Sequence, residues 1–203
     1  MASQVDIGNL CLSILGKPSI ASPGDNSNAA RVLTIEYDLI RRALLTGRAT
    51  WRFSIKRASL PTVTTPPVSG PYTQQYALPT DCLRVLLAGD TYPGLDLSDY
   101  RLGPTDAGYL VEGRNILCDY GAPLSLKYVA DIQDTTQFDA WFVVYFASRL
   151  AYTCCERLTG SDAKQAAANT RMNEALGQAA GSNALENTPE HPADDAWIAA
   201  RLQ

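Results

Sequence analysis

Three aspartates that lie close together in the sequence, Asp131, Asp134 and Asp139, are its best candidates for acid–base catalysis. Two carboxylates that converge in space can serve as general acid and general base. The alternative is structural, because acids at a strand end or at the start of a helix interact favourably with the helix dipole. We favour the structural interpretation and expect that the protein is not an enzyme.

Other motifs for catalysis or for binding a cofactor are missing from the sequence. No serine stands in a glycine-flanked nucleophile motif, and no glycine-rich loop ends in Lys-Ser or Lys-Thr. The only histidine is His191, and the five cysteines lack the spacing of a metal site. We therefore expect neither a metal nor a cofactor. The cysteines are interpreted as small apolar core residues of a protein that folds in a reducing cytoplasm, without a signal peptide.

A basic cluster between positions 41 and 57 is the clearest candidate for a binding surface. Its members are Arg41, Arg42, Arg48, Arg52, Lys56 and Arg57. They could face nucleic-acid phosphates or an acidic protein surface, or they could be the solvated side of a helix that runs into a strand. Stacking aromatic residues do not interleave with them, and a net charge of −4 with a pI near 5.0 disfavours a dedicated nucleic-acid binder.

The charge is distributed unevenly along the chain. Residues 1–61 carry 8 basic and 4 acidic residues, which gives +4, whereas residues 62–203 carry 9 and 17, which gives −8. Surfaces of opposite sign on one molecule suit head-to-tail contact between copies. The alternative is that the solvated faces simply differ in composition.

Hydrophobic periodicity and capping residues predict four helices, over residues 3–16, 27–50, 135–159 and 161–180. Ser3 is a candidate N-cap of the first helix, and Asn26 or Ser27 of the second. Asp134, Thr135 or Thr136 could cap the third. Gly16, Gly160 and Gly181 are expected to end helices. The third is apolar on nearly all sides, so part of its cover could come from a neighbouring subunit.

Residues 51–133 are expected to form a β-sheet insertion between the second and third helices. Trp51, Phe53 and Ile55 alternate with polar residues, which predicts a half-buried strand. Gly113-Arg114 has the pattern of a two-residue hairpin turn between strands at 109–112 and 115–118. The predicted fold class is therefore α+β, with a four-helix bundle-like body over residues 1–181.

Residues 182–203 have a different composition and are predicted to form a flexible, extended C-terminal arm with a short terminal helix. The stretch is polar and contains two prolines, so by itself it lacks the apolar surface needed to fold. It ends in an apolar cluster of Trp197, Ile198 and Leu202, which we expect to dock on a partner or on a neighbouring copy. No segment of the sequence approaches the roughly 20 apolar residues of a membrane span, and no membrane partner is expected.

Six segments carry a resemblance to a known family. They are LGKPSI (15–20), AARVLTIEYDLIRRALL (29–45), WRFSIKRASL (51–60), YALPTDCLRVL (76–86), EGRNILCDYGAPLSLKYVADIQDTTQFD (112–139) and LAYTCCERLTGS (150–161). In this order, over roughly residues 5–180, the sequence resembles the head-to-tail adaptors of short-tailed bacteriophages, the tail tubular protein A family. The combination of Trp-x-Phe with the later Leu-Pro-x-Asp-Cys-Leu-Arg-Val strand is the most specific part.

The resemblance implies a structural virion protein of the phage neck and tail, assembled in the host cytoplasm. It implies a homo-oligomeric ring of about twelve copies between the portal protein and the tail nozzle protein. Double-stranded DNA would pass through the ring during ejection without being specifically bound, and the ring would help to retain the packaged genome. On this basis we expect Arg41, Arg42, Arg48, Arg52, Trp197, Ile198 and Leu202 at portal or subunit contacts. The alternatives are a phage-associated cell-wall hydrolase and a DNA-binding module.

Overall fold

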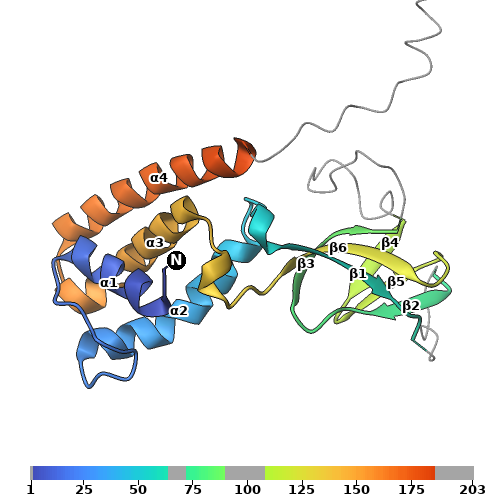
Figure 1. Ribbon diagram of the computed structural model, residues 1–203, viewed down its shortest axis with the longest axis horizontal. Coiled ribbons are helices and arrows are strands. Elements are labelled where there is room, and N and C mark those ends of the chain that lie inside the picture. Colours follow the sequence, from blue (N-terminus) through green and yellow to red (C-terminus); the bar gives the residue numbers. More distant parts are fainter. Residues whose placement is uncertain (1, 64–71, 90–107, 186–203) are drawn as a thin grey trace, which may run out of the picture. The chain divides into compact units, whose positions relative to one another are not determined.

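The structure is a computed structural model that describes residues 2–63, 72–89 and 108–185. These residues form two compact units, each considered by itself. The helical unit comprises Met1–Ser54 and Asp131–Asn187, and the strand unit comprises Ile55–Ala130 (Figure 1). The predicted α+β class is confirmed. The body predicted over residues 1–181 is divided between these two units.

The first two helices begin at the predicted caps. α1 (Gln4–Leu15) starts with a capping box in which Ser3 and Asp6 satisfy each other's backbone N–H groups, and it ends at Gly16 with φ of 64°. α2 (Asn28–Thr46) starts at Ser27, whose side chain accepts a hydrogen bond from the Ala30 N–H. It stops at Thr46, four residues short of its predicted end.

The other two helices differ more from the prediction. α3 (Ala140–Thr159) is capped by Asp139, whose carboxylate accepts hydrogen bonds from two backbone N–H groups of the first turn. A separate 3-10 turn, η2 (Thr135–Gln137), precedes it. Gly160 ends α3 as predicted, with φ of 59°. α4 (Asp162–Leu185) runs through Gly181 instead of stopping there.

The core of the helical unit is built around α3, which packs against each of the other three helices. Aromatic rings fill the end of the core near η1 (Arg52–Ser54): Phe142 lies 4.9 Å from Trp51 and 4.8 Å from Phe53, measured between ring centroids. Trp51, Phe142 and Phe146 are fully buried. Whether the four helices form a regular bundle stays a prediction.

All five cysteines are free and buried, as the core interpretation predicted. Cys11 of α1 and Cys154 of α3 lie close together. A hydrogen bond with Cys154, together with burial, raises the pKa of the Cys11 thiol. These thiols therefore act as small apolar packing groups at the α1–α3 contact.

The strand unit consists of two antiparallel three-stranded sheets. In the first, β6 (Leu124–Ala130) lies between β1 (Ile55–Leu60) and β3 (Cys82–Ala88). Asp81, just before β3, accepts hydrogen bonds from Lys56 at 2.9 Å and from the Tyr128 hydroxyl at 3.0 Å. The Lys56 bond is the main reason that the pKa of Asp81 lies below its usual value.

In the second sheet, β5 (Asn115–Cys118) lies between β2 (Gln74–Ala77) and β4 (Tyr109–Glu112). β4 and β5 form the predicted hairpin, with Gly113 at φ of 58° in its turn. Tyr76, Ile116 and Cys118 have no exposed surface and form the buried face of this sheet.

Two sequence-based boundaries are wrong. Trp51 and Phe53 do not belong to a strand, because residues 52–54 form the 3-10 turn η1 and β1 begins only at Ile55. The turn lets both rings point into the aromatic core. The C-terminal arm does not begin at residue 182, since α4 continues to Leu185. The predicted anchors Trp197, Ile198 and Leu202 lie outside the described residues.

Candidate interaction groove

Arg41 is an internal residue of the helical unit and not the contact residue that the sequence predicted. It is only 1% exposed. Its Nε donates to Asp38 at 3.2 Å, and its Nη1 donates to the Asp131 carboxylate and, at 2.7 Å, to the Ile132 carbonyl. A buried guanidinium with these partners has no surface left for a portal or a neighbouring subunit, so the prediction for Arg41 is wrong.

Arg42, the next residue along α2, remains accessible. Its Nε lies 3.1 Å from the second carboxylate oxygen of Asp131, while 57% of its side chain is exposed. The Asp131 carboxylate is therefore shared between a buried and an exposed arginine. Arg42 could still reach a partner, but its charge is partly neutralised within its own chain.

The three aspartates considered for acid–base chemistry all have structural partners. Asp131 pairs with the two arginines, Asp134 caps η2 and Asp139 caps α3. A hydrogen bond from the Thr136 hydroxyl is the main reason that the pKa of Asp134 lies below its usual value. A depressed pKa suits a cap and opposes a role as general acid near neutral pH.

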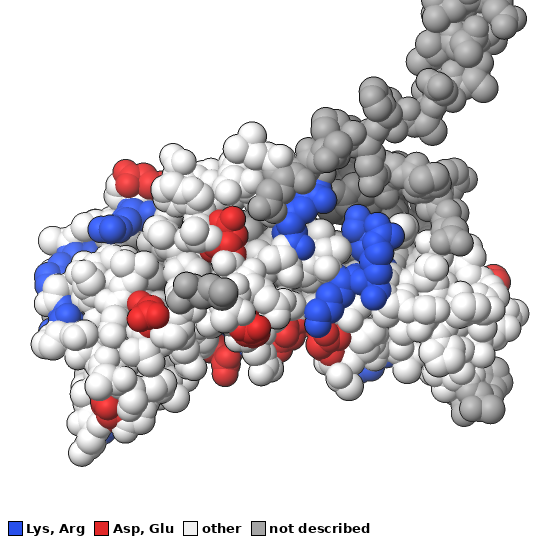
Figure 2. All heavy atoms as spheres, viewed as in Figure 1, with Lys and Arg blue, Asp and Glu red and all other residues white. Residues whose placement is uncertain are grey.

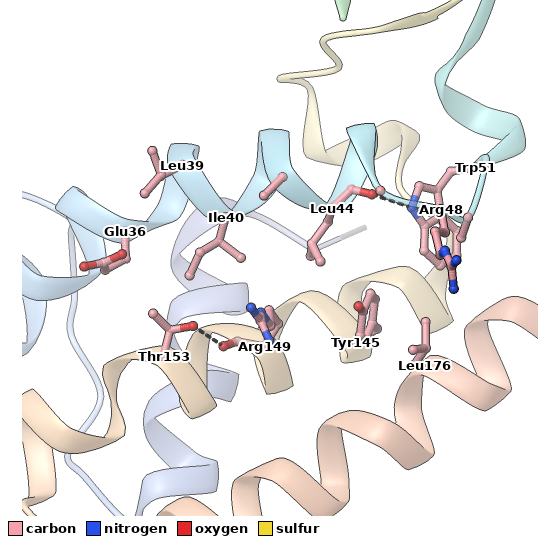
Figure 3. A pocket seen from close by; sticks show the side chains of 13 residues that line it. Glu36, Leu39, Ile40, Leu44, Arg48, Trp51, Tyr145, Arg149, Thr153 and Leu176 are labelled. Atoms are coloured by element: carbon pink, nitrogen blue, oxygen red, sulfur yellow. Dashed lines mark hydrogen bonds between the residues drawn. The ribbon is translucent and has the colours of Figure 1, made fainter. Parts of the chain in front are cut away.

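A groove of about 530 Å³ opens on the helical unit where α2, α3 and α4 face one another (Figure 3). We call it the α2–α4 groove. Its lining residues are Glu36, Leu39, Ile40, Ala43, Leu44, Gly47, Arg48, Ala49, Trp51, Tyr145, Arg149, Thr153 and Leu176. It forms because α2 and α4 both pack on α3, while contact between α2 and α4 themselves is slight.

The floor of the groove is apolar and held in place by a hydrogen bond. Trp51 is 2% exposed and donates its indole N–H to the Leu44 carbonyl at 3.0 Å. This bond satisfies one of the last carbonyls of α2 and fixes the indole against the helix end. Tyr145 of α3 lies beside it, 6.0 Å between ring centroids, and burial raises the pKa of its hydroxyl.

Arginines supply the charge of the groove. Arg149 of α3 lies among apolar and aromatic atoms, with its guanidinium 3.5 Å from the Met172 sulfur and 5.6 Å from the centre of the Tyr152 ring. Glu36 also lines the groove, but Arg157 neutralises it at 3.2 Å. Within the described residues, neither Arg48 nor Arg149 has a carboxylate within 4.0 Å. The groove therefore carries uncompensated positive charge.

The rim of the groove exposes apolar side chains. Leu39 of α2 is 69% exposed, and Ile35, one turn earlier, is 61% exposed outside the groove. On α3, Trp141 is 44% exposed and lines a second, shallower hollow of about 830 Å³ against α4. Figure 2 shows acidic and basic side chains interspersed over the left part of the view and several basic side chains side by side near its centre.

The C-terminal end of α4 is tied to the segment that follows the groove. Asn183 accepts a hydrogen bond from the Arg52 backbone N–H and donates one to the Thr50 carbonyl, both at 2.9 Å. These two hydrogen bonds hold the last turn of α4 beside the end of the groove that Arg48 and Trp51 line. Of the four predicted arginines, the structure thus places Arg48 in the groove and Arg52 next to it.

Sequence reasoning missed Tyr145 and Arg149 as groove residues. The signal was the spacing of Trp141, Tyr145 and Arg149, which places large side chains on one face of α3 at intervals of four residues. The sequence alone predicts only a helix that is apolar on nearly all sides, and this face is not distinguished from the others. The structure packs α1, α2 and α4 against α3 and leaves this face partly open.

The chain is an α+β protein whose helical unit carries an open, apolar groove lined in part by arginines. No model of a known protein family matches the chain, and no similar sequence is found among curated proteins. Among the described residues there is no group of three or more acids, histidines or cysteines placed to hold a metal ion. None of the helices described has the length and apolar character of a membrane span.

Proposed function

We propose that the protein is a structural head-to-tail adaptor of a short-tailed bacteriophage. In this role about twelve copies form a ring between the portal protein and the tail nozzle protein. The ring completes the DNA channel of the virion and helps to retain the packaged genome. Double-stranded DNA passes through it without specific binding, and the chain performs no catalysis.

The resemblance supports this proposal because its segments coincide with structural elements. The segment 29–45 falls within α2, and 51–60 comprises Trp51, η1 and β1. The segment 76–86 joins β2 to β3, and 112–139 runs through β5 and β6 to the N-cap of α3. The likeness therefore involves both units of the chain.

The single observation that carries the proposal is the α2–α4 groove with its exposed apolar rim. A groove lined by Trp51, Tyr145 and two arginines, which have no acidic partner in the part of the chain that the structure describes, has the composition of protein-binding hot spots, which are enriched in Trp, Tyr and Arg. Leu39 at 69% exposure gives a partner apolar surface to cover. An adaptor needs such surfaces, because its function consists of contacts with the portal, the nozzle and its own copies.

The alternatives find less support in the geometry. A hydrolase would use the acids at 131, 134 and 139, and all three are engaged in ion pairs or caps. A DNA-binding module would use the basic cluster, but Arg41 is buried and Arg42 is paired with Asp131. Arg42, Arg48 and Arg52 remain the predicted contacts with the portal or with neighbouring subunits.

The test is to mix the purified full-length chain with purified portal rings of the phage that encodes it and to examine the mixture by negative-stain electron microscopy. We expect an extra ring of density on the tail-facing side of the portal, and a monomer or mixture when the chain sediments alone at micromolar concentration. Portal rings without added density, at concentrations where the chain is soluble, would refute the proposal. A stable ring without portal would refute the order of assembly.

A further inference from the structure

We infer that the α2–α4 groove is the docking site for the C-terminal segment, residues 194–202, of a neighbouring copy of the same chain. This inference rests on the proposed function, because the ring supplies the neighbour. It names the occupant of the groove, which the resemblance does not. Four features carry it: charge, apolar character, the point where the described chain ends, and the composition of the spacer.

The charges of segment and groove are complementary. The chain after Leu185 contains four acids, Glu186, Glu190, Asp194 and Asp195, and only one arginine, Arg201. The groove offers the guanidinium groups of Arg48 and Arg149, which have no acidic partner within the described residues. Complementary charge steers the two surfaces together and disfavours basic competitors, whose charge the arginines repel.

The apolar groups are complementary as well. Asp194 and Asp195 directly precede Trp197, Ile198 and Leu202, and the last two have the i, i+4 spacing of one helical face. Amphipathic helices dock in apolar grooves through anchors with this spacing. A volume of about 530 Å³ lies within the range of ligand pockets, and the floor offers an indole, a tyrosine ring and aliphatic side chains.

The place where α4 ends favours an exchange between copies. Asn183 ties the end of α4 beside the Arg48 end of the groove, so the last described residues of the chain lie next to the acceptor site. In a closed ring this arrangement repeats, and each donor can serve the next acceptor around the ring. An interface of this kind is heterologous and uses one groove and one segment for every copy.

The spacer between α4 and the anchors favours a neighbour over the same chain. It contains Pro189 and Pro192, and proline fixes φ and favours an extended, semi-rigid backbone. The eight residues 186–193 can span up to about 28 Å when extended. A semi-rigid spacer of this reach is long enough to bring Trp197 to the groove of an adjacent copy, and its prolines disfavour the tight reversal that docking on the same chain needs.

The test uses a fluorescent synthetic peptide of residues 186–203 titrated into the full-length protein at a concentration where the protein sediments as a monomer. We expect saturable binding that falls more than tenfold when the peptide carries Trp197→Ala, because a buried tryptophan anchor is the main hot spot. Absence of saturable binding to the full-length chain overturns the inference.

A matched pair of protein variants locates the site. Leu39→Asp and Ile35→Asp change exposed apolar residues one turn apart on α2, but only Leu39 lines the groove. We expect Leu39→Asp to weaken peptide binding about tenfold or more and Ile35→Asp to leave it unchanged. Both variants should melt like the parent chain. Equal loss in the two variants, or no loss in either, overturns the assignment to the groove.

Charge reversal gives an independent readout. Arg48→Glu is expected to weaken binding about fivefold, and a peptide with Asp194→Lys and Asp195→Lys should bind the Arg48→Glu protein better than it binds the parent. A loss that the reversed peptide does not recover would overturn the charge pairing.

Docking within one chain is distinguished by a further variant. If the parent protein rejects the peptide while full-length Trp197→Ala protein binds it, the groove is occupied by its own segment, and the neighbour assignment is wrong. The portal assay is separate. Portal attachment without peptide binding refutes only this inference, whereas peptide binding without portal attachment refutes the proposed function.

Discussion

Arg41, near the C-terminal end of α2, and Arg48, just after that helix, lie seven residues apart, yet they have different surroundings. Arg41 points into the helical unit, is 1% exposed and bonds to two carboxylates and a carbonyl. Arg48 lies just beyond the last turn of α2, lines an open groove and has no carboxylate within reach among the described residues. The sequence placed both in one basic cluster.

The difference shows that the distance to a carboxylate decides whether an arginine is held inside the fold by an ion pair or stays accessible to a partner. Asp131 stands immediately after β6, where the chain returns from the strand unit to the helical unit, and it meets Arg41 and Arg42 there. An ion pair at this junction ties the return of the chain to α2. Arg48 lies beyond the reach of that pair, so its charge stays available to a partner.

The largest expected effect follows from removing the buried guanidinium. Arg41→Met should lower the free energy of unfolding by about 3 kcal/mol, because Asp131, whose side chain is only 10% exposed, would keep only the exposed Arg42 as a charged partner. Urea denaturation followed by circular dichroism at pH 7 measures this change. Soluble protein with an unchanged midpoint would show that the network contributes nothing to the fold.

Arg42→Ala is the matched control, since it removes the other partner of the same carboxylate. The Arg42 side chain is 57% exposed, and solvent-exposed ion pairs contribute at most about 1 kcal/mol. The loss in unfolding free energy should therefore be larger for Arg41→Met than for Arg42→Ala. If both variants lose the same stability, burial does not distinguish the two arginines.

A second, smaller effect is expected at Trp51, which joins the core to the floor of the groove. Trp51→Phe removes the indole N–H that satisfies the Leu44 carbonyl, and it leaves space among the surrounding rings. We expect a loss of about 1–3 kcal/mol in unfolding free energy. Trp141→Phe serves as the control, because Trp141 is 44% exposed and should cost under about 0.5 kcal/mol.

Local signals made several elements predictable. The Ser27 cap, the Gly160 terminator and the Gly113 turn each act within a few residues, and each occurs where the sequence places it. The α+β class follows from the change of period between residues 51 and 133. The resemblance to a family added function and partners, but those rest on likeness and await the portal experiment.

Long-range contacts made the rest unpredictable. Asp131 reaches Arg41 across 90 positions, and no local pattern marks that pairing. Gly181 predicts a helix end, but Asn183 bonds to Thr50 and Arg52, and these tertiary bonds offset the cost of about 1 kcal/mol for an internal glycine. The groove also escaped detection, because it depends on how α2 and α4 flank α3.

A third prediction concerns Asp139 and distinguishes its role as the N-cap of α3 from a role as a catalytic acid. Asp139→Ala should lower the unfolding free energy by about 1 kcal/mol, because the carboxylate accepts hydrogen bonds from two N–H groups at the start of α3. Asp139→Ser, which can also cap, should recover most of that loss. Serine lacks a carboxylate, so a function that needs Asp139 as an acid would not be rescued in this way.

The smallest effect on stability is expected at Arg48. Arg48→Ala should change the free energy of unfolding by less than about 0.5 kcal/mol, because the side chain is exposed and has no acidic partner among the described residues. The same substitution should weaken attachment to portal-bearing heads or to neighbouring copies, measured by co-sedimentation with portal rings. Unchanged melting combined with weaker attachment is the pattern of a contact residue, and Arg41→Met should show the reverse order of effects. If Arg48→Ala destabilises the chain as much as Arg41→Met does, the two arginines share one structural role, and the groove loses the charge on which its assignment to an acidic segment depends.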